Sequence, residues 1–333
     1  MSLLDAVGLG DNPKLSTIAF DNEEDWLQLR TKGIGGSDAG AILGLNKYSS
    51  PLAVYKAKVD GIQKDLSDNA NVRRGKELED FVLEKYVKPK MHEYGFTVTK
   101  PDFMIVNEDY PFLRANVDGI ARSVTNGSYK TSLLIEIKCV SAFAEDAWDG
   151  PDYCGIPPYY YAQIQHYLAV TGMRAGYLVA LFDKTWSVKW YAVKRDENFI
   201  AGMLPKLKQF YEVNMCMEIP PKIDYALDKE DAAKAIDDAS DIAFVPNEDM
   251  QKLVVEYTDV SSKIKELEKL KNDLVSNILE MYRQGQKPTS GVVKFSTVKS
   301  SRFNSARFKK EHPDMYEEYC EESESPRSTI KLK

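Results

Sequence analysis

A six-residue run at positions 133–138, with the sequence LLIEIK, constrains the fold of this chain more than any other feature. Its apolar residues predict a buried strand, and strand alternation puts Glu136 and Lys138 on one face and Ile135 and Ile137 on the other. A carboxylate and an ammonium group on one face can share a site, in which the carboxylate holds a hard cation and the lysine orients or deprotonates a water molecule. The alternative, which a lone pair of charges favours, is a solvated strand face with one salt bridge.

A second carboxylate, Asp118, precedes this run in the chain. Two β-rich runs within residues 112–138 flank Asn126-Gly127, a pair that favours a tight hairpin turn, so we expect the runs to pair as antiparallel strands. Asp118 and Glu136 then lie on neighbouring strands. Together with the backbone carbonyl of Ile137 they supply the oxygen ligands that Mg²⁺ prefers. The hairpin therefore predicts a magnesium site.

The register of this hairpin decides whether the site can form. With a strict two-residue turn, Asp118 pairs with Ile135 and its side chain points away from Glu136, because neighbouring positions on a strand face opposite sides. A shift of one residue brings the two carboxylates to the same face. We therefore predict an irregularity between them, which is a β-bulge, a bend at Gly119 or an odd-numbered loop.

A third carboxylate, Glu79, lies on a helix predicted from Arg74 to about Lys88, where Pro89 is expected to stop it. It sits one turn beyond Gly75 and can complete a second cation site. The alternative is a solvated helix face, which this segment alone favours.

Arg30 and the Gly-rich segment 33–37 (GIGGS) suit an anion. The segment leads into the apolar run 39–45, which predicts a short helix capped by Ser37 or Asp38. A guanidinium group, a hydroxyl and the free amides of a helix N-terminus together form a site for phosphate. The alternative, which is the commoner one for such a segment, is a simple turn.

Gln163 and Tyr167 are four residues apart on a helix predicted after Pro157-Pro158, so both side chains can reach one site. By themselves they would be polar residues at the edge of the core. We expect His166 on the surface of this helix. The elements that follow complete an α/β layer and are predicted at residues 177–182 (strand), 187–193 (strand) and 198–213 (helix).

The composition changes after Pro220-Pro221. Residues 224–249 hold nine carboxylates against two lysines, which is typical of a solvated linker. Apolar residues then recur at alternating steps of four and three over about four heptads, broken at Lys271, and predict a coiled coil. The sequence leaves open whether this helix packs on its own chain or associates with another copy. The apolar residues are Leu253, Tyr257, Val260, Ile264, Leu267, Leu274, Ile278 and Met281.

Charge and composition restrict the class of protein. The chain has 43% hydrophobic and 29% charged residues, as expected for a globular protein, and a net charge of -7. Between Lys287 and Lys310, however, there are seven basic residues and no acidic one, which gives a local basic surface. With no basic leader and no apolar stretch of about 18 residues, we expect a cytoplasmic protein without a membrane segment. The four cysteines form no CxxC pair and predict neither a zinc nor an iron–sulfur site.

Taken in order, five motifs resemble the PD-(D/E)XK nuclease superfamily, and more narrowly the phage recombination exonucleases of the YqaJ and lambda-exonuclease type. The resemblance covers residues 25–215 and implies an α/β, restriction-endonuclease-like core, a mixed central sheet flanked by helices, with a coiled-coil-like helical extension at the C-terminus. Its strength lies in the order of the motifs, since no single one is specific. The motifs are Arg30 with Gly35-Gly36-Ser37-Asp38, Arg74-Gly75 with Glu79, Asp118-Gly119, Glu136-Ile137-Lys138 and Gln163-Ile164-Gln165-His166-Tyr167.

The resemblance implies a role for each residue of the cation site. Asp118, Glu136 and the Ile137 carbonyl would bind Mg²⁺, and Glu79 would support a second ion, with Mn²⁺ able to substitute. Lys138 would orient the attacking water molecule and help to deprotonate it.

The same resemblance implies a phosphate site. Arg30, Ser37 and Gln163 match the group that grips the 5′-phosphate of the digested strand in that family. Asn116 stands where the family has a serine and keeps a hydrogen-bond donor. Tyr167 completes the family's QxxxY element.

The family digests the 5′-ended strand of duplex DNA and leaves a 3′ overhang for a single-strand annealing protein of the RecT or Redβ kind, often as a ring and typically as a trimer. We therefore expect a nuclease domain over residues 1–218, an acidic linker over 219–247, and a long helix plus basic segment over 248–333. Two alternatives remain: a structure-specific endonuclease of the same fold, and a non-catalytic module that binds DNA through residues 287–310.

Overall fold

The computed structural model describes residues 3–62, 70–125, 128–239, 245–297 and 299–320. The chain forms two compact units, Met1–Asp228 and Lys229–Lys333. The first unit contains every residue that the sequence assigned to the candidate site. It extends past position 218 to Asp228, whose buried carboxylate accepts a hydrogen bond of 2.5 Å from the Ser50 hydroxyl.

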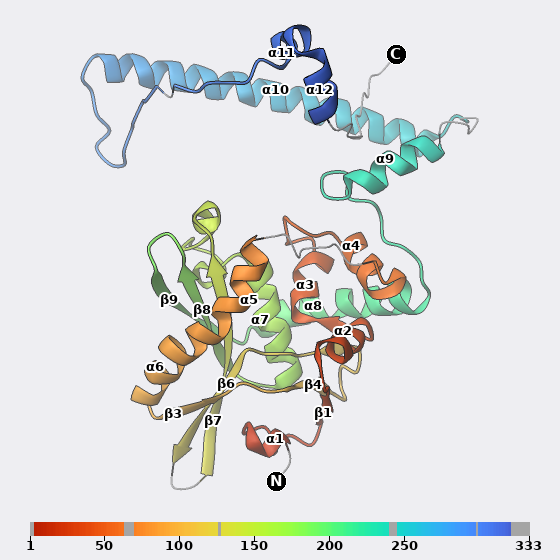
Figure 1. The fold of residues 1–333 in the computed structure, drawn as a ribbon, viewed down its shortest axis with the longest axis vertical. Helices are drawn as coiled ribbons and strands as arrows, with labels where there is room; N and C mark the ends of the chain where they lie inside the picture. Colours follow the sequence, from red (N-terminus) through yellow and green to blue (C-terminus); the bar gives the residue numbers. More distant parts are fainter. Residues whose placement is uncertain (1–2, 63–69, 126–127, 240–244, 298, 321–333) are drawn as a thin grey trace. The chain divides into compact units, whose positions relative to one another are not determined.

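A mixed five-stranded sheet with the order β3-β6-β7-β8-β9 forms the centre of the first unit. β7 and β8 are parallel, and the other neighbouring strands are antiparallel. Figure 1 shows helices on both sides of this sheet, so the predicted α/β class with a mixed central sheet is confirmed. The strands are β3 (Phe96–Thr99), β6 (Gly119–Thr125), β7 (Ser128–Val140), β8 (Ala175–Phe182) and β9 (Ser187–Lys194).

The β6–β7 hairpin contains one register shift. Near its turn, Thr125 pairs with Ser128, and farther along Ser123 pairs with Thr131. The two pairs differ by one residue, so Lys130 of β7 is inserted between them. An extra residue on one strand of an antiparallel pair is a β-bulge, and it changes the face on which every later residue lies relative to the partner strand.

The bulge brings the two carboxylates together. Beyond it, Gly119 pairs with Ile135, and the same register carried one residue further puts Asp118 beside Glu136. The predicted irregularity between these two residues is therefore confirmed, and it is a bulge rather than a bend. The proposed turn residues Asn126-Gly127 lie outside the described residues.

The two faces of β7 pack against different helices. Ile135 and Ile137 join a core cluster with residues of α5, η2 and α6, whereas Leu134 joins the cluster that includes α7. The predicted alternation of the run 133–138 is confirmed. The helices are α5 (Ala70–Val82), the π-helical turn η2 (Leu83–Val87), α6 (Lys88–Glu93), α7 (Pro158–Thr171), α8 (Glu197–Gln209) and the π-helical turn η5 (Phe210–Cys216).

Pro89 does not stop the helix that contains Glu79, and this prediction is wrong. The chain continues through η2 into α6, where Pro89 occupies the first turn. Proline is tolerated there because the backbone N–H that it lacks has no partner within the helix.

The N-terminal part of the first unit contains the Gly-rich segment 33–37, which leads into the short helix α3. This helix faces α7. Gly35, and not Ser37 or Asp38, is the N-cap of α3, and the Asp38 carboxylate accepts a hydrogen bond of 2.8 Å from the Gly35 amide. Gly36 and Gly40 face α7, where a Cβ on Gly36 would lie 2.4 Å from the Tyr167 ring. The elements here are α1 (Leu3–Ala6), β1 (Leu15–Ala19), α2 (Glu23–Thr31), β2 (Ile34–Gly35), α3 (Gly36–Ile42), α4 (Pro51–Tyr55), the π-helical turn η1 (Lys56–Asp60), β4 (Phe103–Asn107) and β5 (Leu113–Arg114); two 3-10 turns, η3 (Ala142–Ala147) and η4 (Tyr153–Gly155), precede α7.

The second unit is helical. It contains α9 (Lys229–Asp238), which lies inside the segment 219–247 expected as a solvated linker, and the long helix α10 (Glu248–Arg283) that the heptad pattern predicted. Two short helices follow, α11 (Ser305–Glu311) and α12 (Pro313–Tyr319). Among the described residues, no helix is both long enough and apolar enough to cross a membrane.

His166 is fully buried, so its predicted place on the surface of α7 is wrong. Its Nε2 lies 3.1 Å from the Ile34 carbonyl of β2, to which it donates as the neutral imidazole. Burial lowers the pKa of His166 to about 4. The histidine therefore joins α7 to the Gly-rich segment and stays uncharged at neutral pH.

The buried histidine predicts a loss of stability in weak acid. An unfolded chain protonates this imidazole below a pKa of about 6.5 while the folded chain does not, so stability falls as the pH drops from about 6.5 towards 4. Between pH 7 and pH 5, this histidine contributes about 2 kcal/mol to that fall. Urea unfolding should show a smaller pH dependence for His166→Gln than for the unsubstituted chain. The exposed His92→Gln serves as control, and equal pH dependence of the two variants would contradict the assignment.

Candidate active site

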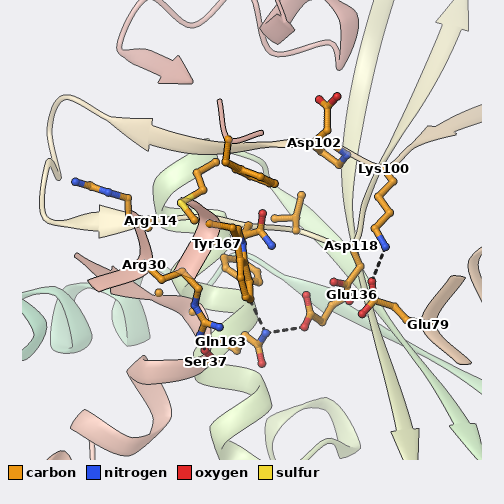
Figure 2. A pocket seen from close by; sticks show the side chains of 18 of the residues that line it. Arg30, Ser37, Glu79, Lys100, Asp102, Arg114, Asp118, Glu136, Gln163 and Tyr167 are labelled. Atoms are coloured by element: carbon orange, nitrogen blue, oxygen red, sulfur yellow. Dashed lines mark hydrogen bonds and ion pairs between the residues drawn. The ribbon is translucent and has the colours of Figure 1, made fainter. Parts of the chain in front are cut away.

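A cleft of about 930 Å³ opens in the first unit and brings the candidate residues together (Figure 2). Its walls include residues of α2, the start of α3, α5, the segment just before β6, the strand β7, and α7. All nine side chains singled out from the sequence line it: Arg30, Ser37, Glu79, Asn116, Asp118, Glu136, Lys138, Gln163 and Tyr167.

Glu136 lies at the centre of this cleft and is 2% exposed. Its Oε1 accepts hydrogen bonds from Lys138 Nζ at 2.5 Å and from Gln163 Nε2 at 2.6 Å. The same Gln163 amide lies 3.2 Å from the Tyr167 hydroxyl, so the QxxxY pair orients the carboxylate from α7. The other oxygen, Oε2, is buried and has no hydrogen-bond partner among the described residues.

Asp118 is held beside Glu136 by the backbone of the neighbouring strand. Its Oδ2 accepts a hydrogen bond of 2.7 Å from the amide of Ile137. This contact depends on the register set by the bulge, because a one-residue slip would put the Asp118 side chain on the opposite face. Ile137 thus contributes its amide to the site, and the proposed role of its carbonyl as a ligand stays a prediction.

The three charged groups perturb one another. Burial, and then the charge of Glu136, raise the pKa of Asp118 well above its usual range, and burial raises the pKa of Glu136. Burial opposes the charge of Lys138, but Glu136 and Asp118 outweigh it and raise the pKa of this lysine. The two buried carboxylates destabilise each other's charged form. A divalent cation bound between them would relieve this repulsion.

The donor set at this place fits a hard cation. Glu136 Oε2 is an oxygen that is buried and unpartnered among the described residues, and Asp118 lies next to it. Glu79 lines the same cleft, but its Oε1 accepts a hydrogen bond of 2.8 Å from Lys100. The part of the chain that the structure describes contains no group of three or more His, Cys, Asp or Glu side chains arranged around a metal position. A second cation site with Glu79 would require Lys100 to withdraw.

At the other end of the cleft, Arg30 and Ser37 lie together. Arg30 Nη2 donates a hydrogen bond of 3.0 Å to Ser37 Oγ, and the guanidinium group stacks 4.6 Å from the centre of the Trp26 ring. Asn116 also lines the cleft. Figure 2 shows Arg30 and Ser37 on the side of the cleft nearest Gln163, away from Glu79. A guanidinium group, a hydroxyl and an amide in one cleft can bind a phosphate.

Lys58 lies behind the Arg30–Ser37 end of the cleft, and no motif in the sequence pointed to it. Its side chain is 6% exposed, and its ammonium group lies 2.7 Å from Asp38 Oδ2 and donates a hydrogen bond of 2.7 Å to the Arg30 carbonyl. Asp38 in turn accepts from the Gly35 amide. One buried ion pair therefore ties α2, η1 and the start of α3 together. Burial lowers the pKa of Lys58 against the opposing effect of Asp38.

Several other lining residues were also missed. Trp26, Lys100, Asp102 and Arg114 come from segments that carry no recognisable motif. The sequence offered no signal for them, because their place in the cleft follows from tertiary contacts between segments distant in the chain.

The cleft holds two carboxylates and a lysine on neighbouring strands at one end, and an arginine and a serine at the other. This arrangement is expected for a nuclease of the lambda-exonuclease type. Residues 25–174 match the model of the YqaJ-like viral recombinase domain. The uncharacterized protein YqaJ of Bacillus subtilis (strain 168) is 27% identical over 320 residues, which are 93% of this chain and 94% of that protein. The resemblance to YqaJ-type proteins inferred from the order of the motifs is confirmed.

Solved structures with a similar chain path include two described as exonucleases. The alkaline exonuclease LHK-Exo from Laribacter hongkongensis shares 23% identity, with a TM-score of 0.44, and the match covers 58% of this chain and 93% of that one. A phage related exonuclease from Haemophilus somnus 129PT shares 13% identity, with a TM-score of 0.37, and the match covers 58% of this chain and all of that one (100%).

The buried Lys58–Asp38 pair predicts a large loss of stability when one partner is removed. Lys58→Met leaves the Asp38 carboxylate buried without its lysine and should lower the free energy of unfolding by about 3 kcal/mol, as measured by urea denaturation. Lys58→Met combined with Asp38→Asn should recover part of this loss, because a neutral amide can still accept from Gly35. Lys14→Met, which breaks the exposed pair with Asp109, should change stability little. Equal losses for Lys58→Met and Lys14→Met would contradict a structural role for the buried pair.

Proposed function

We propose that this protein is a magnesium-dependent exonuclease that digests the 5′-ended strand of double-stranded DNA, in the 5′ to 3′ direction, and leaves 3′ overhangs. The observation that supports it most is the single cleft that holds Asp118, Glu136 and Lys138 at one end and the Arg30–Ser37 pair at the other. The first group suits phosphodiester hydrolysis, and the second suits recognition of a terminal phosphate. Together they support cleavage a short way from the end of a strand.

Asp118 and Glu136 would hold Mg²⁺, or Mn²⁺ in its place, with the Ile137 carbonyl as a further ligand and Glu79 beside a second ion. The bound cation supplies positive charge that neutralises the nonbridging and leaving oxygens as the phosphodiester breaks. Gln163 holds Glu136 Oε1, so that Oε2 stays directed into the site. The protein thus fixes its oxygen ligands before any cation arrives.

Lys138 acts on the attacking water molecule. In the cation-free protein its pKa is raised by Glu136 and Asp118, so it is charged and can orient the water by a hydrogen bond. A cation held by the two carboxylates would offset their charge, so it would lower the pKa of Lys138 and make this lysine a better proton acceptor. The Tyr160 ring, 5.3 Å from the ammonium group, limits where this side chain can move.

Arg30, Ser37, Gln163 and Asn116 would bind the 5′-phosphate of the strand being digested. A terminal phosphate carries more negative charge than an internal diester, so a guanidinium group at a fixed distance from the carboxylates favours strand ends. The Lys58–Asp38 pair keeps the Arg30 backbone and the start of α3 in place for this contact.

The partners proposed for this activity are double-stranded DNA and a RecT or Redβ-like single-strand annealing protein, which would take the 3′ overhang into phage-type recombination. The match to a viral recombinase domain supports this setting. Association of several copies in a ring, for example a trimer, would keep the enzyme on the duplex between successive cleavages.

Loss of the central groups should abolish digestion. Glu136→Gln and Lys138→Ala should each reduce Mg²⁺-dependent digestion of a duplex on the order of a hundredfold or more, because each removes a group that acts on the reacting atoms. DNA binding, measured by fluorescence anisotropy in EDTA, should stay largely unchanged. The exposed substitutions Glu108→Gln and Lys194→Ala are the matched controls. Unchanged digestion by Glu136→Gln would rule out the proposed site.

The phosphate end should control preference for the substrate terminus. Duplexes labelled at either end, with a 5′-phosphate or a 5′-hydroxyl, separate an exonuclease of this polarity from an endonuclease of the same fold. Arg30→Ala and Ser37→Ala should reduce the preference for the 5′-phosphate by roughly ten- to a hundredfold, the usual effect of losing a hydrogen bond to a charged group. Digestion that ignores the 5′-phosphate in the unsubstituted chain would exclude Arg30 and Ser37 as its receptor.

A further inference from the structure

The long helix α10 presents an apolar stripe that the described residues of its own unit leave exposed. The helix spans 36 residues without a single buried one, and Figure 1 shows it as one continuous rod. Large apolar side chains that are 41–65% exposed recur along it at steps of three and four residues. They are Met250, Leu253, Tyr257, Val260, Ile264, Leu267, Leu274, Ile278 and Met281. A stripe of this period is the seam of a coiled coil.

We propose that α10 is a parallel, in-register coiled-coil interface with α10 of another copy of this chain. In heptad terms, Met250, Tyr257, Ile264 and Ile278 occupy the a positions, and the d positions hold mainly leucine. The β-branched residues Ile264 and Ile278 at a, with leucine at most d positions, fit the pattern that favours two strands in a parallel coiled coil. This inference concerns the second unit and does not depend on the proposed nuclease activity.

Charge complementarity selects the parallel direction. In a parallel pair, a g residue faces the e residue five positions later on the partner helix. Lys263 occupies a g position, and Glu268 occupies the e position five residues later. Lys263 of each chain therefore faces Glu268 of the other chain, which gives two such pairs in a two-stranded coil. Within its own helix Lys263 has only a loose, exposed contact with Asp259 at 3.8 Å, which leaves its ammonium group able to reach the partner.

The antiparallel arrangement lacks this complementarity. When the a and d layers are aligned antiparallel, g residues face g residues, so Lys263 faces Leu270, and Glu268 at e faces Ser261. No opposite charges then meet across the seam. The parallel arrangement also puts Lys271, the one polar residue at an a position, into a layer with its own copy. A polar a residue fixes the register at some cost in stability, because any slip would bury it against apolar neighbours.

Disulfide trapping in the full chain tests this assignment. Leu253→Cys, at a d position near the start of α10, should form a disulfide-linked pair of chains under mild oxidation, in a background where Cys154, Cys216 and Cys320 are serine. Val255→Cys, at the f position on the outer side of the same turn, is the matched control and should form little. A linkage between Leu253→Cys chains and Ile278→Cys chains would show an antiparallel seam and overturn the proposal. Equal linkage of Leu253→Cys and Val255→Cys would overturn it as well.

Charge exchange gives a second readout that does not depend on cysteine chemistry. Glu268→Lys sets two lysines against each other and should weaken association roughly tenfold in sedimentation velocity. Lys263→Glu combined with Glu268→Lys should restore it, whereas Glu266→Lys at an outer c position should have little effect. Weakening by Glu268→Lys without restoration by the double exchange would contradict the pairing of Lys263 with Glu268.

Discussion

The site depends on one hydrogen bond, which the Ile137 amide donates to Asp118 across the β6–β7 hairpin over 2.7 Å. This bond can form only because Lys130 is inserted into β7 and shifts the register beyond the turn by one residue. Since strand side chains alternate with a period of two, the same sequence without that shift would present one carboxylate to the cleft and the other to the opposite face of the sheet. A local irregularity in the hairpin thus decides whether the chain has an active site.

The structure around Glu136 disfavours the charged carboxylate and compensates its charge only in part. Glu136 is buried, and only one of its oxygens is satisfied, by Lys138 and Gln163. A protein interior usually excludes such an arrangement, because an unpaired buried carboxylate oxygen costs several kcal/mol in the absence of a partner. Such an oxygen beside Asp118 supports the proposal that a cation binds here, because a cation would partner it.

The end of the cleft that holds Arg30 and Ser37 relies on close packing. Gly36 and Gly40 let α3 approach α7 to a distance that any Cβ would prevent, and the buried His166 and Lys58 then fasten the Gly-rich segment by hydrogen bonds. These contacts set the distance between the Arg30–Ser37 pair and the carboxylates. Gly36 and Gly40 are therefore required by the packing of α3 against α7, although a Gly-rich segment is by itself typical of a turn.

The sequence by itself determined what depends on short-range periodicity: the alternation in residues 133–138, the helix that carries Gln163 and Tyr167, the heptads of α10, and the order of motifs that carries the resemblance to YqaJ-type proteins. It also showed that a site with both Asp118 and Glu136 requires an irregular hairpin, because the regular register puts the two side chains on opposite faces. Only the tertiary structure decided that the irregularity is a bulge, that His166 is buried, that Lys58 pairs with Asp38 and that Glu79 is held by Lys100. Except for the bulge, these are contacts between segments distant in the chain, which leave no periodic pattern in the residues on either side.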